Sequence, residues 1–115
     1  MKKVVLFAFN GEMMCFVHVL LNALDMKGKG FNTKIVVEGS ATKLIPDLSV
    51  EGNLLYGPFK KAQAENLIDG VCKVCATKMG TAEAAQSIGL PLLSDMWGHP
   101  GMAKYLQEGY QVIVF

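Results

Sequence analysis

Two cysteines stand in C-x-x-C spacing in the segment Cys72-Lys73-Val74-Cys75. In a cytosolic chain, this spacing is more typical of redox, sulfur or metal chemistry than of a structural disulfide. The residues before Cys72 favour a strand and those after it favour a helix. Cys75 would then lie one helical turn from Cys72, where the two thiols can form a disulfide or pass a sulfur atom between them.

The position of Cys72 at the start of a helix predicts an activated thiol. Free backbone N–H groups would stabilise a thiolate there, and Lys73 and Lys78 add positive charge nearby. We therefore interpret Cys72 as the nucleophile and Cys75 as the second, resolving thiol, and we expect Cys72 to react faster than the remaining cysteine, Cys15. The alternative is that both are small apolar residues of the core.

A second pair, Cys15 and His18, has the spacing C-x-x-H. Together with Cys72 and Cys75 it would make a Cys₃His set of the kind that zinc favours. A metal site is the less favoured interpretation, because no short zinc-knuckle loop joins the two pairs. Cys15 and His18 would then be solvent-side or interface residues of an otherwise apolar helix.

Ligands of open parallel sheets bind at the carboxyl ends of the strands. The segments expected at those ends are Asn10-Gly11, Glu38-Gly39-Ser40, Cys72 to Cys75 and Asp95 to His99. From them we take Asn10, Gly11, Lys73, Trp97 and His99 as candidate substrate-binding residues. The structural alternatives are that His99 only opens a helix and that Trp97 fills the core.

Strands and helices are expected to alternate along the chain. Strands are predicted at 3–9, 33–38, 69–72, 91–94 and 110–115, and helices at 12–27, 58–68, 73–79, 81–89 and 99–108. Ser40 is expected to cap a further short helix that Pro46 stops. The alternation predicts one α/β domain over residues 1–115, with a mainly parallel five-stranded sheet and helices on both faces.

The segment 12–27 is apolar around roughly two-thirds of its circumference, with only a narrow polar stripe. A helix on one sheet needs about a third of its surface apolar. This excess predicts a homo-oligomer with the helix at the subunit interface.

Composition excludes several classes of protein. Of 115 residues, 51% are hydrophobic and 18% charged, which is a globular composition, and the net charge is +1 with eleven Lys and no Arg. Without Arg or a basic cluster, nucleic acid is a poor partner. No apolar run reaches the length of a membrane span, and no leader pattern follows Met1-Lys2-Lys3, so we expect a cytoplasmic protein. Nucleotide-binding glycine motifs are absent, and we expect no cofactor.

The segment Val71-Cys72, with Ala76 and Gly80 after it, resembles the strand–cysteine–helix segment of the DsrE/DsrF-like (YchN-like) sulfur-relay family. The opening strand with Asn10-Gly11 and the closing strand 110–115 are also similar. The resemblance implies a three-layer α/β/α domain that forms trimers or hexamers. It also implies a cysteine at the Cys72 position that accepts sulfur as a persulfide and passes it on, with a possible donor or acceptor protein as partner.

That single-cysteine relay does not require Cys75, and a cysteine near the C-terminus, which some relay members use, is absent here. The extra thiol leaves a dithiol redox or desulfurising role open. The leading hypothesis is thus a small sulfur-transfer or thiol-redox protein. The alternatives are a non-catalytic oligomeric module that binds a small ligand or partner, and a metal-binding structural protein.

Overall fold

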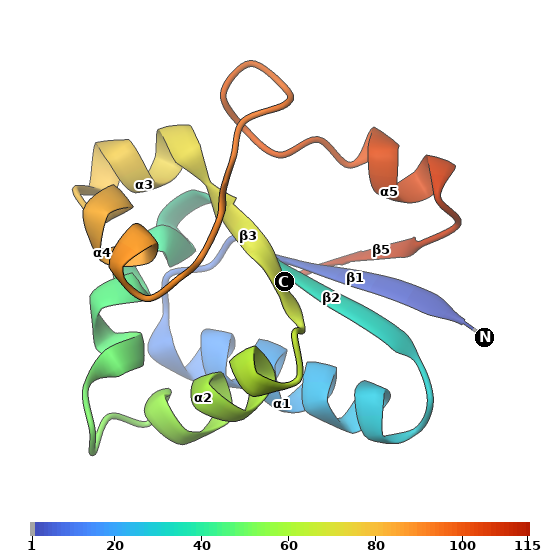
Figure 1. Ribbon diagram of the computed structural model, residues 1–115, viewed down its shortest axis with the longest axis horizontal. Coiled ribbons are helices and arrows are strands. Elements are labelled where there is room, and N and C mark those ends of the chain that lie inside the picture. The colour runs from blue at the N-terminus through green and yellow to red at the C-terminus, as the bar shows by residue number, and fades with distance from the viewer. Residues whose placement is uncertain (1) are drawn as a thin grey trace.

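A computed structural model describes residues 2–115 and contains one parallel sheet (Figure 1). Its strands are β1 (Lys3–Ala8), β2 (Asn32–Val37), β3 (Ile68–Cys72), β4 (Leu92–Leu93) and β5 (Gln111–Val114). They lie in the order β4-β3-β2-β1-β5, and every pair of neighbours is parallel. The predicted five-stranded sheet is confirmed.

A continuous apolar run forms β1 because both faces of the sheet are covered at this strand. In β1, Val4, Leu6 and Ala8 pack into the larger core cluster, whereas Val5 and Phe7 pack into a second cluster on the opposite face. All five side chains are buried. The strand therefore shows no polar alternation in its sequence.

The helices lie on both faces and complete a three-layer α/β/α fold. The larger cluster includes residues of α1 (Met13–Gly28), η1 (Gly39–Ser49), α2 (Tyr56–Ala64), α3 (Lys73–Met79) and α4 (Ala82–Ser87). The opposite face is covered by α5 (Ala103–Gln107) and the connection that precedes it. In Figure 1, α1 and α2 lie below the sheet and α5 above it.

A polar contact on the second face ties α5 to the sheet. Asp69 of β3 accepts a hydrogen bond from the Tyr105 hydroxyl and pairs with Lys34 of β2, with 3.1 Å between Lys34 Nζ and Asp69 Oδ1. The Tyr105 ring also packs edge-on against Phe7. Burial and the Asp69 carboxylate raise the pKa of Tyr105, so its hydroxyl stays a proton donor in this contact.

Two local predictions are wrong. Ser40 does not cap a helix that Pro46 stops, because the segment is a 3₁₀ helix that contains Pro46 and begins after Glu38, whose carboxylate accepts from Gly39 N. Ser40 Oγ instead accepts from Gly11 N and donates to Phe9 O, joining the ends of β1 and β2. Pro46 has no N–H to donate, which disfavours a regular α-helix through this position, whereas a run of short 3₁₀ turns loses only the one bond.

The second wrong prediction is the helix at 99–108, which begins only at Ala103. His99 pairs with Met96 in a short antiparallel bridge, so its backbone is used in a turn instead of a helix start. This difference brings the His99 ring to Cys72 and Cys75.

Most of the apolar surface of α1 is covered within the chain. Its buried residues pack on the sheet, and α2 lies against its flank. Met14 and Leu21 remain exposed among its large apolar side chains. A second helix of the same chain thus covers much of the surface that suggested an oligomer. Association of copies through α1 stays a prediction, which a native-mass measurement tests.

Within residues 2–115, the structure contains no helix with both the length and the apolar character needed to cross a membrane.

The close approach of β3 and β4 depends on Gly70. A Cβ on Gly70 would lie 2.6 Å from Leu93 Cγ and 2.8 Å from Pro91 O. We expect Gly70→Ala to lower the free energy of unfolding by about 1–3 kcal/mol, because β4 must move to admit the methyl group. Denaturant unfolding followed by circular dichroism measures this loss.

Gly28→Ala is the matched control, since a Cβ on Gly28, in the last turn of α1, would meet no atom within 4 Å. It should leave stability unchanged or raise it by up to about 1 kcal/mol. Equal unfolding midpoints for the Gly70→Ala variant and the unmodified chain would contradict the packing described for β3 and β4.

Candidate functional site

The candidate site lies at the carboxyl edge of the sheet, where segments distant in sequence meet. Glu38 directly follows β2, Cys72 is the last residue of β3, and Cys75 lies in the first turn of α3. His99 comes from the connection between β4 and α5. Carboxylate, thiol and imidazole atoms of these four residues all lie within 4.8 Å of one another.

The change from strand to helix at Cys72 brings the thiols together. β3 ends at Cys72, which serves as the N-cap of α3, and its sulfur accepts a hydrogen bond from Cys75 N at 3.3 Å. A sulfur atom here takes the place that a Ser or Asp oxygen holds at most helix starts. The predicted arrangement, with Cys75 one turn after Cys72 on the same face, is confirmed.

A tight turn carries His99 to the thiols. Met96 and His99 exchange backbone hydrogen bonds of 2.7 and 2.8 Å, and Trp97 and Gly98 between them have φ values of 55° and 87°. Gly98 O also accepts from Val74 N at 3.1 Å, which fixes the turn to the first turn of α3. A Cβ on Gly98 would lie 2.2 Å from Val74 Cγ2, so this position requires glycine.

Each thiol has a proton acceptor beside it. His99 Nδ1 lies 3.1 Å from Cys72 Sγ and 3.6 Å from Cys75 Sγ. Cys75 donates its S–H to Glu38 Oε1 at 3.1 Å, and the same oxygen lies 3.7 Å from His99 Nδ1. The arrangement can remove a proton from either sulfur when it attacks, which is the general-base assistance that a thiol nucleophile needs.

Burial raises the pKa of both thiols. For Cys72, loss of water is the largest cause, and the Cys75 thiol and Glu38 act in the same direction, while the Cys75 backbone N–H opposes them. For Cys75, burial again comes first, with Glu38 adding to it and Cys72 opposing it. The predicted stabilisation of a Cys72 thiolate is therefore wrong, because desolvation outweighs the N–H group. Lys73 and Lys78 lie exposed on α3.

A largely apolar cavity of about 640 Å³ opens beside the cluster. Cys75, Glu38 and His99 contribute its reactive groups, whereas Cys72 is fully buried and does not line it. The rest of the lining is Phe9, Gly39, Met96, Pro100, Met102 and Ala103. A small apolar molecule in this cavity would meet Cys75 before Cys72.

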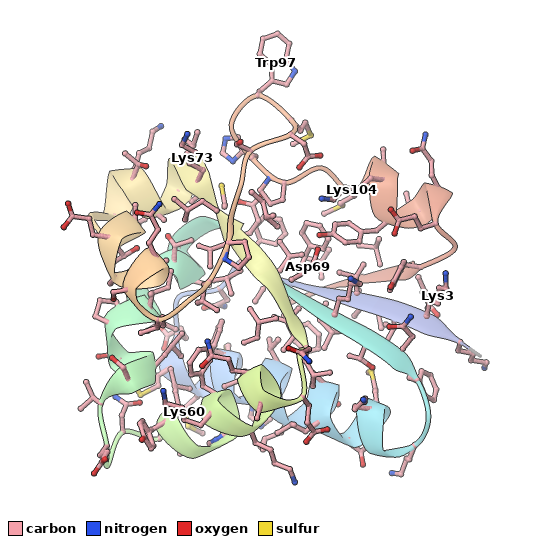
Figure 2. The ribbon with its side chains drawn as sticks, in the orientation of Figure 1. Lys3, Lys60, Asp69, Lys73, Trp97 and Lys104 are labelled. Carbon is pink, nitrogen blue, oxygen red and sulfur yellow. The ribbon has the colours of Figure 1, made fainter. Side chains whose placement is uncertain are left out.

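The other predicted binding residues lie outside this cavity. Asn10 Oδ1 accepts from Glu12 N at the start of α1, and Gly11 is packed so closely that a Cβ would lie 2.7 Å from Ser40 O. Lys73 borders a separate cavity of about 370 Å³. Trp97 is 95% exposed and points away from the sheet at the tip of its connection, as Figure 2 shows; it neither fills the core nor faces the thiols.

The Cys₃His set, which the sequence left as a less favoured alternative, does not form. Cys15 and His18 are exposed on α1, and His18 Nδ1 contacts Met14 O, whereas the group around Cys72 and Cys75 contains His99 and Glu38 instead. Glu38 is the site residue that sequence reasoning did not assign. Its position directly after the second strand was the available signal, because neighbouring parallel strands end at the same edge.

Comparison with known proteins gives relatives without an assigned activity. No protein-family model matches the chain. An uncharacterized protein of Methanocaldococcus jannaschii, MJ0733, is 35% identical over 102 residues, which are 89% of this chain and 81% of the relative. An uncharacterized protein of Archaeoglobus fulgidus is 34% identical over 59 residues, 51% of this chain and 95% of its own.

The fold has a solved counterpart. The structure of BT1422, a conserved protein of unknown function from Bacteroides thetaiotaomicron, aligns with a TM-score of 0.74 over 99% of this chain and 95% of its own. The two sequences are 15% identical, so the likeness concerns the fold alone.

Burial should order the reactivity of the three cysteines. We expect iodoacetamide near neutral pH to alkylate the exposed Cys15 first, Cys75 more slowly and the buried Cys72 last. This order reverses the one that the sequence predicted for Cys15 and Cys72. Peptide mapping of timed samples measures it, with protein in denaturant as the control in which the three rates converge. Alkylation of folded Cys72 as fast as that of Cys15 would contradict the burial described here.

Proposed function

The chain belongs to the family of the uncharacterized protein MJ0733 of Methanocaldococcus jannaschii, and we propose that it is a thiol-redox or sulfur-transfer protein that uses Cys72 and Cys75 as a pair. The observation that carries the proposal is the position of the two thiols. They occupy the N-cap and the first turn of one helix, each with a proton acceptor in contact, beside an apolar cavity. A purely structural pair of small apolar residues does not need Glu38 and His99 at these distances.

The exposure of the two sulfurs favours Cys75 as the thiol that meets the substrate. Cys75 lines the cavity and donates to Glu38, which can take its proton during attack. Cys72 is fully buried behind it and contacts His99. The roles proposed from the sequence, with Cys72 first and Cys75 second, are therefore exchanged in this proposal.

Sulfur transfer from a small persulfide, R–S–SH, proceeds in two steps. The Cys75 thiolate attacks the outer sulfur, the S–S bond of the donor breaks, and R–SH leaves with the proton held by Glu38, giving Cys75–S–SH. The Cys72 thiolate, its proton taken by His99, then attacks the inner sulfur and releases H₂S, leaving a Cys72–Cys75 disulfide. The two thiols lose two electrons and the transferred sulfur gains them. A thiol reductant restores the pair.

The cavity suggests the kind of donor. Its lining is mainly Met, Phe, Pro and Ala side chains, so an organic persulfide or disulfide with a small apolar group fits it better than a highly charged one. Membership of the DsrE/DsrF-like family remains part of the proposal. It is supported by the three-layer fold and by a cysteine at the end of the third strand, followed by a helix and Gly80. A cytoplasmic location would keep the pair reduced.

Mass spectrometry of the Cys15→Ser variant tests the proposal, because that variant has only the paired thiols. After treatment with an organic persulfide, we expect H₂S release and a loss of two hydrogens from the peptide containing residues 72–75. Adding Cys72→Ser should stop H₂S release and leave a persulfide on Cys75. Adding Cys75→Ser should prevent both products.

Glu38→Gln keeps the size of the side chain and removes its basicity, so it should slow persulfide formation on Cys75 without removing the pair. The proposed function would be overturned if Cys72 and Cys75 both remained free thiols after prolonged exposure to a persulfide and to a mild disulfide oxidant. Persulfide on Cys72 in the Cys75→Ser variant would show that Cys72, and not Cys75, is the thiol that attacks the donor.

A further inference from the structure

We propose that Glu38, Cys72, Cys75 and His99 form a tetrahedral binding site for zinc or a similar borderline-soft divalent ion in the reduced protein. The inference does not depend on sulfur transfer: it uses the arrangement of the four ligand atoms, which come from three segments of the fold. It groups the C-x-x-C cysteines with Glu38 and His99, and not with Cys15 and His18, the set that the sequence left as a less favoured alternative.

Four of the six distances between the ligand atoms lie near the edges of a tetrahedral site, and all six are within 4.8 Å. Metal–ligand bonds of about 2.0 to 2.3 Å for nitrogen, oxygen and sulfur give tetrahedron edges of about 3.3 to 3.8 Å. The separations in the structure are 3.1 Å for Cys72 Sγ–His99 Nδ1, 3.1 Å for Cys75 Sγ–Glu38 Oε1 and 3.6 Å for Cys75 Sγ–His99 Nδ1. His99 Nδ1–Glu38 Oε1 is 3.7 Å. Shifts of a few tenths of an ångström would centre an ion.

The ligand types select the ion. Two thiolates and an imidazole favour zinc and similar transition metals over magnesium or calcium, which prefer oxygen atoms throughout. Four protein ligands from a largely buried cluster leave no open position, which is the form of a structural or storage site.

Contacts around the ligands hold them in place. Glu38 accepts a hydrogen bond from Gly39 N at 2.9 Å, which orients its carboxylate. Cys72 Sγ accepts a hydrogen bond from Cys75 N, and this contact also stabilises a metal-bound thiolate. The bond from Val74 N to Gly98 O fixes the turn that carries His99. The ligands are thus oriented before a metal binds, which lowers the cost of binding.

Charge balance makes a second prediction. Binding of M²⁺ replaces two S–H bonds with two metal–sulfur bonds and releases two protons to solvent. With one carboxylate and a neutral imidazole, the occupied site carries a net charge of −1. Because a Cys72–Cys75 disulfide removes two ligands, metal and disulfide exclude one another, so oxidation would release the ion.

Titration of the reduced protein with Co²⁺ tests the site. We expect saturation at one equivalent, thiolate-to-cobalt charge-transfer absorption, the intense visible bands of tetrahedral cobalt, and release of two protons per metal ion in weakly buffered solution. Zn²⁺ should displace the cobalt and erase the colour. Cys72→Ser, Cys75→Ser and His99→Ala should each lose tight binding, and Glu38→Gln should weaken it.

The matched controls are Cys15→Ser and His18→Ala, which should bind as the unmodified chain does. Circular dichroism checks the fold of each variant. If the buried Cys72→Ser variant does not fold, His99→Ala decides, since His99 lies in a connection and not in the core. Weak octahedral bands, or binding lost in the Cys15→Ser and His18→Ala variants but kept in His99→Ala, would overturn the proposal.

The metal site and the proposed function can fail separately. No bound metal, together with a Cys72–Cys75 disulfide after persulfide treatment, would overturn the site and leave the proposed function intact. The opposite result would be tight tetrahedral metal binding by a protein whose metal-free form makes neither persulfide nor disulfide. It would support the site and remove the proposed function.

Discussion

The hydrogen bond from Val74 N to Gly98 O joins the start of α3 to the turn that carries His99, and the reactive cluster depends on it. The bond forms only because Gly98 has no side chain to collide with Val74, and because Trp97 and Gly98 accept positive φ values. Without it, the turn that carries His99 would lose its backbone hydrogen bond to α3. The imidazole would no longer lie 3.1 Å from Cys72 Sγ, and the pair would keep only Glu38 as a proton acceptor.

The sheet supplies the other half of the cluster. β2 and β3 are adjacent and parallel, so Glu38 and Cys72 end at the same edge. Burial then determines how these groups behave: it raises the pKa of both thiols, and it makes neighbouring proton acceptors necessary for attack. The same four groups can hold a divalent ion when the thiols are reduced or form a disulfide when they are oxidised, which joins the two proposals in one site.

Sequence patterns predicted the sheet because β1 is a continuous apolar run and strand-like and helix-like segments alternate after it. They predicted the thiol geometry because the strand-to-helix change at Cys72 is local. They did not predict the environment of His99, which depends on a contact between residues 74 and 98. They also did not predict the burial of Cys72, which raises the pKa of its thiol where a lowered pKa was expected. Glu38 was not assigned because one carboxylate after a strand has no distinctive spacing, and Cys15 and His18 were grouped with the thiols although α1 holds them elsewhere.

The central claim is that Cys72 and Cys75 act as one dithiol, and its most direct test is equilibration of the protein with thiol–disulfide redox buffers. Samples are quenched with acid and mapped by mass spectrometry. The account predicts a single two-electron transition confined to an intramolecular Cys72–Cys75 disulfide, with Cys15 responding independently. Separate mixed disulfides of Cys72 and Cys75 with the buffer thiol, and no bond between them at any potential, would contradict it.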